Sequence, residues 1–247
     1  MEKTYLAQIS EKANKKKRKM FTAALIFFIV VGGVVAFALK DSMDMNDPSD
    51  KKLAGLFIGL AAFMLFTCIF GLIGSIKTAT KGQCLILPFN DRTKEEAAAI
   101  IDREAAEGKL LVDEYISDFS DGGKPGGERV VLTPTYLLLD NGLGKLKAIP
   151  RDKICWHCAQ VGIKGRSSFV VRLLVFTEDQ QFYVDGTDVP YVEALSEKLY
   201  AHMPNIFPEA DTFAFSHQMD ALFNKDRKAF LKLCEEARST ETQSWTS

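Results

Sequence analysis

Leu53 to Ile76, which reads LAGLFIGLAAFMLFTCIFGLIGSI, is an apolar stretch without a charged side chain in a chain of 247 residues. An α-helix rises ~1.5 Å per residue, so a helix over these residues is long enough to cross a hydrocarbon core that is ~30 Å thick. The stretch lacks the polar stripe that runs along the core helix of a soluble protein. It therefore predicts a transmembrane helix.

A second apolar run lies upstream. Residues 20–39, MFTAALIFFIVVGGVVAFAL, are also uncharged, and together the two runs predict a transmembrane hairpin over residues 20–76 with spans 20–39 and 53–76. The basic residues before the run and the sequence Ala36-Phe37-Ala38 also fit a cleaved signal peptide. We favour the hairpin, because the first run is long for a signal peptide and the second run follows closely.

Lysines and arginines around the two runs predict their orientation. The basic segment of residues 1–19 ends in Lys15-Lys16-Lys17-Arg18-Lys19, whereas the loop of residues 40–52 carries three lysines and four aspartates. Because basic flanks stay on the cytosolic side, we expect an integral protein of the cell membrane with both termini in the cytoplasm. Neither run contains an ionisable residue, so we expect no proton or ion pathway through them.

The composition of the whole chain excludes some classes of protein. Its formal net charge is −1, so no overall basic excess points to nucleic acid as a partner. It has five cysteines at scattered positions, one of which, Cys68, lies inside an apolar run. An odd and scattered set is not a secreted disulfide framework, and it fits a reducing compartment.

Residues 77–208 are predicted to form a cytosolic domain. It begins with a helix, because Thr93 and Glu96 have the spacing of a capping box. A second helix, whose apolar stripe includes Val192 and Leu199, closes the domain. Between the two helices lie seven short segments that are rich in β-branched and aromatic residues, which predicts strands. They are residues 110–117, 128–132, 136–140, 145–149, 154–161, 169–177 and 182–185.

Seven consecutive strands and a closing helix predict a small antiparallel β-barrel or sandwich that the helix plugs. Three segments, together with the closing helix, resemble the bacterial pleckstrin-homology-like domains. The segments are Val131-Leu-Thr-Pro-Thr-Tyr-Leu-Leu-Leu139, Ala148-Ile-Pro-Arg-Asp-Lys-Ile154 and Leu174-Val-Phe176. The resemblance covers residues 110–203. It implies a binding or scaffolding role beside a transmembrane hairpin, and it supplies no catalytic residues.

Residues 209–247 are predicted to form a helical tail. Phe215, Met219 and Phe230 fall near one stripe, which Asp226 interrupts. We therefore expect the tail to dock on the domain or to form a short helical hairpin, with a disordered end from Ser239. The expected fold class is a membrane-anchored α+β protein: a transmembrane hairpin, a PH-like β-domain with its capping helix, and this tail.

One segment of the β-domain is strongly basic. Seven basic residues lie between residues 145 and 172, against the single acid Asp152. They predict a face that binds a partner or anionic lipid headgroups, although lysines on a solvated strand edge would also explain them. The seven are Lys145, Lys147, Arg151, Lys153, Lys164, Arg166 and Arg172.

Cys155-Trp156-His157-Cys158 contains a pair of cysteines at the spacing of a redox or zinc motif. The segment lies in a predicted strand, where side chains alternate between faces, so we expect the two thiols to point in opposite directions. Trp156 and Cys158 are then expected on the core side. No second pair completes four metal ligands, so no metal and no cofactor are predicted.

The sequence contains no phosphate-binding loop, nucleophile elbow or zinc-protease motif. We therefore expect a non-enzymatic, membrane-anchored cytosolic module that binds a protein partner, with anionic lipid headgroups as a second candidate ligand. The alternative is a membrane-tethered thiol-redox or metal-binding protein that uses Cys155, His157 and Cys158.

Overall fold

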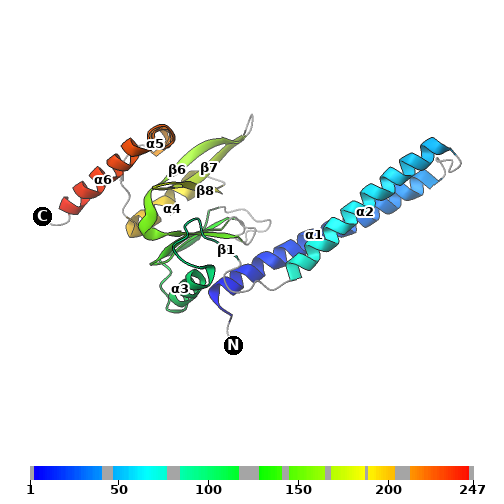
Figure 1. The fold of residues 1–247 in the computed structure, drawn as a ribbon, viewed down its shortest axis with the longest axis horizontal. Coiled ribbons are helices and arrows are strands. Elements are labelled where there is room, and N and C mark those ends of the chain that lie inside the picture. The colour runs from blue at the N-terminus through cyan, green and yellow to red at the C-terminus, as the bar shows by residue number, and fades with distance from the viewer. Residues whose placement is uncertain are drawn as a thin grey trace. The chain divides into compact units, whose positions relative to one another are not determined.

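The structure is a computed structural model of the chain, and it describes residues 3–40, 47–76, 84–116, 128–140, 145–164, 168–186, 189–203 and 212–244. The chain divides into two compact units. One comprises Met1–Leu6 and Lys81–Ser247 and contains both β-sheets, whereas the other comprises Ala7–Thr80 and is helical (Figure 1).

The helical unit contains α2 (Pro48–Ile76) and most of α1 (Tyr5–Lys40). The two helices touch where the ring of Phe21 lies against the backbone of Gly71, because a Cβ atom at Gly71 would be 2.5 Å from that ring. Large apolar side chains along both helices are nevertheless exposed. They include Ile26, Phe27, Val34, Leu56, Ile58, Phe63 and Phe70.

One stretch of the described residues, Lys52–Gly71, is long and apolar enough to cross a membrane, with a mean hydropathy of 2.4 and 6% of it buried. The prediction of a two-helix transmembrane hairpin is therefore wrong. Residues 20–39 belong to α1, whose first half carries the basic segment.

The helix α3 (Lys94–Ala106) begins with the predicted capping box. The backbone N–H of Glu96 donates to Thr93 Oγ1 over 3.3 Å, and the N–H of Thr93 donates to Glu96 Oε2 over 2.9 Å. These bonds satisfy two of the donors that the first turn of a helix leaves open. Gly108 follows the helix with a φ of 69°, a left-handed conformation that glycine adopts without strain.

Within the described residues, eight strands form two sheets. The first sheet has the order β1-β5-β4-β3-β2 and the second has the order β6-β7-β8. Each predicted strand overlaps one of β2 to β8, which confirms those seven segments. The strands are β1 (Leu85–Ile86), β2 (Val112–Tyr115), β3 (Arg129–Leu132), β4 (Tyr136–Asp140), β5 (Leu146–Pro150), β6 (Ile154–Lys164), β7 (Ser168–Thr177) and β8 (Gln181–Gly186).

The two sheets do not close into a barrel, and the first is mixed because β1 pairs with β5 in parallel. The predicted antiparallel barrel is therefore wrong, and the fold is a mixed α+β fold. β1 occupies the side of β5 that a strand of the second sheet would need. Pro150 ends β5, and a 3-10 turn, η1 (Arg151–Lys153), carries the chain to the second sheet. Proline favours this break because it has no N–H to donate to a strand.

The main core lies between the two sheets and beneath α4 (Val189–His202). Alternate residues of the strands point into it, such as Leu137 and Leu139 of β4 and Leu173 and Val175 of β7. The apolar stripe of α4 is buried there as predicted, through Val192, Leu195 and Leu199.

The tail is helical, as predicted, and it packs on the outer face of the second sheet. It forms α5 (Thr212–Lys225) and α6 (Arg227–Ser244), which are separated at Asp226, whose carboxylate accepts a bond from the N–H of Ala229 over 3.1 Å. Aromatic rings join the tail to the sheet, with the Phe176 and Phe230 centroids 5.3 Å apart. α6 extends to Ser244, beyond Ser239, and it contains no glycine or proline to end it earlier.

Candidate functional site

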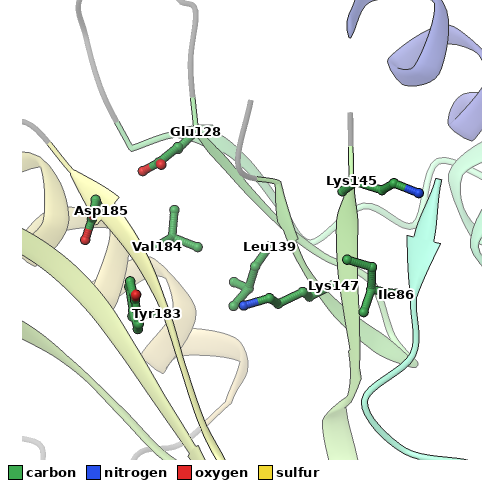
Figure 2. A pocket seen from close by; sticks show the side chains of 8 residues that line it. All are labelled: Ile86, Glu128, Leu139, Lys145, Lys147, Tyr183, Val184 and Asp185. Atoms are coloured by element: carbon green, nitrogen blue, oxygen red, sulfur yellow. The ribbon is translucent and has the colours of Figure 1, made fainter. Parts of the chain in front are cut away.

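A hollow of about 160 Å³ lies between the two sheets, beside β8. Its lining combines an apolar floor with charged side chains from both sheets. Figure 2 shows β8 on one side, with β5 and β1 on the other. The lining residues are Ile86, Glu128, Leu139, Lys145, Lys147, Tyr183, Val184 and Asp185.

Lys147 is the charged residue that enters the hollow. It pairs with Leu139 across β4 and β5, and therefore shares the inner face of the sheet with this core residue. Figure 2 shows the Lys147 side chain extending beside Leu139 toward Val184. Its Nζ lies 5.7 Å from the centre of the Phe182 ring on β8. A half-buried ammonium group over an aromatic face at an open end of the core is well placed to meet an anionic group.

Asp185, an acidic residue that lines the hollow, lies beside the guanidinium group of Arg172. Asp185 Oδ1 lies 3.7 Å from Arg172 Nε, and the Arg172 guanidinium lies 4.7 Å from the centre of the Tyr183 ring. Asp185 and Arg172 are directly opposite each other on β8 and β7. The charge of Asp185 is thus balanced from the outer face of the second sheet, and the other charged side chains that line the hollow are Glu128, Lys145 and Lys147.

The structure brings two of the seven predicted basic residues, Lys145 and Lys147, to this hollow. It places the other described ones elsewhere. Arg151 donates to the carbonyl oxygen of His202, Lys153 is exposed on η1, and Arg172 pairs with Asp185. The side chains of Lys164 and Arg166 lie outside the described residues.

Cys155, Trp156 and Cys158 are buried together in an apolar cluster beneath the tail helices. Trp156 and Cys158 share one face of β6, but it is the outer face of the second sheet under the tail and not the expected core side. The expectation that the two thiols point in opposite directions is also wrong. The register of β6 shifts between Ile154 and Trp156, and this irregularity brings Cys155 into the same cluster as Cys158. Burial raises the pKa of the Cys158 thiol well above its ordinary range, which disfavours the reactive thiolate.

His157 points to the opposite side of β6, toward α4. Its Nε2 lies 3.4 Å from the carbonyl oxygen of Met203, and its Nδ1 lies 3.3 Å from Ser196 Oγ. A carbonyl only accepts, so Nε2 carries the proton and Nδ1 accepts from the Ser196 hydroxyl. Burial lowers the pKa of His157 to about 4, so the ring is neutral at pH 7. Its exposed fraction is 1%, so the pair holds α4 in place and is out of reach of a substrate.

A second polar cluster, which no pattern in the sequence predicts, lies at the start of α1. Arg129 forms two hydrogen bonds with the Asp113 carboxylate, and its guanidinium lies 5.7 Å from the centre of the Tyr5 ring. The N–H of Leu6 donates to Asp102 Oδ1 of α3 over 2.9 Å. These contacts hold Tyr5 and Leu6 on the β-domain, although about a hundred residues separate the partners in sequence.

No group of three His, Cys, Asp or Glu side chains within the described ranges is arranged to hold a metal ion. No family model, curated protein or solved structure matches the chain. The hollow must therefore be interpreted from its own chemistry.

Proposed function

We propose that the protein is a membrane-attached binding module that holds a short segment of a partner protein in the hollow between its two sheets. The observation that carries this proposal is the position of Lys147, a half-buried lysine on the inner face of β5 beside an apolar floor. A charge at such a site costs stability unless it meets a partner. A lysine in this position therefore favours a binding role over a packing role.

The size of the hollow limits its ligand. Sites for cofactors and drug-sized molecules occupy ~300–1,000 Å³, whereas this hollow has about 160 Å³. It accommodates one amino-acid side chain of a partner that otherwise lies on the surface. The observations favour such a partner over a polyanionic lipid headgroup, because Glu128 and Asp185 line the same hollow as the two lysines.

The proposal includes a relationship to the pleckstrin-homology-like domains. Four strands joined antiparallel, β2 to β5, then the three strands β6 to β8, then α4, support it. The parallel strand β1, α3 and the tail hairpin are additions to that arrangement. Domains of this kind serve as binding modules, in agreement with the role proposed for the hollow.

Membrane attachment is the second part of the proposal, and Lys52–Gly71 supports it. Only 6% of this stretch is buried within the protein. A bilayer is therefore the environment that removes its apolar side chains from water.

Selection from a random-peptide display library against the full chain in lipid nanodiscs tests the binding role. We expect selected peptides to lose most of their affinity for the Lys147→Met variant and to keep it for Lys153→Met, a matched change of an exposed lysine on η1. Failure to select any peptide, or peptides that bind both variants equally, would contradict a binding role for the hollow.

A further inference from the structure

β8 is an edge strand beside the hollow. It pairs with β7 on one side, and no described strand pairs with its other side. The edge of a sheet presents backbone N–H and C=O groups to which another strand can bond. Figure 2 shows this edge of β8 turned toward the hollow, with Val184 pointing across it.

The register of the β7–β8 hairpin identifies which backbone groups point outward. The N–H of Thr177 donates to the carbonyl oxygen of Gln180 over 2.9 Å, so these two residues form a hydrogen-bonded pair at the turn. Hydrogen-bonded and non-hydrogen-bonded pairs alternate along an antiparallel ladder. Leu174 and Tyr183, three pairs further on, are therefore a non-hydrogen-bonded pair, and the N–H and C=O of Tyr183 point away from β7.

A strand added at this edge would place one side chain in the hollow. Residues directly opposite each other in a sheet point to the same face. Val184 belongs to the inner face, so the residue opposite Val184 would point inward as well, toward Leu139 and Lys147. A glutamate suits this position, because its methylene groups meet the apolar floor and its carboxylate meets the Lys147 ammonium group.

We propose that β8 is a docking edge, where an extended segment of a partner protein adds as a fourth strand of the second sheet and places a glutamate in the hollow. This inference rests on the proposed function and specifies how the hollow is used. The main-chain bonds supply affinity, and the inward side chain supplies specificity, as in other cases of strand addition. A strand from a second copy of this chain is the competing occupant, and the experiment separates the two.

Two variants at one position test the main-chain bonds. Tyr183→Pro removes the outward N–H but no bond to β7, and proline is tolerated on an edge strand whose N–H faces outward. Tyr183→Ala is the matched control, because it removes the same ring and keeps the N–H. Thermal unfolding of both variants establishes that the β-domain remains folded. N-methylation of the selected peptide at alternate residues makes the same test from the ligand side.

For peptides selected on the full chain in nanodiscs, we expect a shared glutamate flanked by β-branched residues. We expect affinity to fall about tenfold or more with Tyr183→Pro and with a glutamate-to-glutamine peptide, and to remain within about threefold with Tyr183→Ala. Equal affinity for the proline and alanine variants would overturn strand addition, while dependence on Lys147 would still leave the binding role standing. Self-association of the chain that competes with the peptide and is lost with Tyr183→Pro would instead identify a second copy as the occupant.

Discussion

The Nζ atom of Lys147 lies 5.7 Å from the centre of the Phe182 ring, across the gap between the two sheets. Lys147 belongs to β5 and Phe182 to β8, so this contact joins the sheets where no strand pairing does. The ring attracts the ammonium group without neutralising its charge. The contact therefore keeps a cation inside the hollow and available to an incoming carboxylate.

If Lys147 serves binding, its removal should cost the fold little. For Lys147→Met we expect the free energy of unfolding to change by less than about 1 kcal/mol, because the lost cation–π contact is offset by removal of a charge from an apolar site. Urea unfolding, followed by tryptophan fluorescence, measures the change. A loss of several kcal/mol would show that Lys147 is a structural residue.

The buried ring of His157 predicts acid sensitivity. Burial lowers its pKa to about 4 in the folded state, against 6.5 ordinarily, so the unfolded chain binds a proton that the folded chain does not. Stability is therefore lost as the pH falls from about 6.5 to about 4, by an amount on the order of 3 kcal/mol. Urea unfolding across this range should show the slope in the wild type and a smaller slope in His157→Gln. The exposed His202→Gln is the control, and an unchanged slope in His157→Gln would contradict this assignment.

We expect the Asp113–Arg129 pair to hold the start of α1 on the β-domain. Asp113→Ala leaves the guanidinium of Arg129 partly buried between Tyr5 and Tyr115, and we expect a loss of about 1–3 kcal/mol. Hydrogen exchange at the Leu6 amide should also become faster. Glu107→Ala, which breaks the solvent-exposed pair with Lys109, should cost far less. Equal effects of the two changes would argue against the specific role of the first pair.

We expect Phe230 to anchor the tail helices on the second sheet. Its side chain is fully buried between Phe176 and Phe223, so Phe230→Ala should cost about 3–5 kcal/mol and release α6 to proteolysis. Leu233→Ala, on the same helix, is the control because Leu233 is 39% exposed. A tail that resists protease equally in both variants would show that Phe230 does not anchor it.

A charge placed at Leu60, near the middle of Lys52–Gly71, should weaken membrane attachment. An arginine at the centre of a span costs about 2.5–3.5 kcal/mol of insertion, so Leu60→Arg should shift the protein toward the soluble fraction after alkaline extraction. Leu53→Arg, at the end of the stretch, should have a much smaller effect. Complete extraction of the wild-type protein would contradict membrane attachment through α2.

Local patterns in the sequence predicted the elements of the β-domain well. The capping box at Thr93, the stripe of Val192 and Leu199, and the break at Asp226 are all local, because each depends on residues within one or two helical turns. Strand positions followed from β-branched and aromatic runs for the same reason. Each of these features is determined by residues that are neighbours in sequence, and tertiary packing did not override them.

Pairing between distant segments was not predictable from the sequence. Nothing in the sequence of the two-residue strand β1 indicates that it pairs with β5, yet it takes that side of β5 and leaves the barrel open. The irregularity near Cys155 reversed the expected direction of one thiol. Lys147 stood out only as one of seven basic residues, because its inward direction depends on the register of β4 and β5. The hollow could therefore not be found before the register was known.

The decisive measurement is a methyl NMR titration of the full chain in nanodiscs with a selected peptide. The methyl groups of Leu139, Val184 and Ile86 line the hollow and report on its occupancy. We predict that the peptide shifts these three sets of signals in the wild-type protein and leaves them unchanged in Lys147→Met. Shifts that are confined to the tail helices, or that persist in Lys147→Met, would contradict the assignment of the hollow as the binding site.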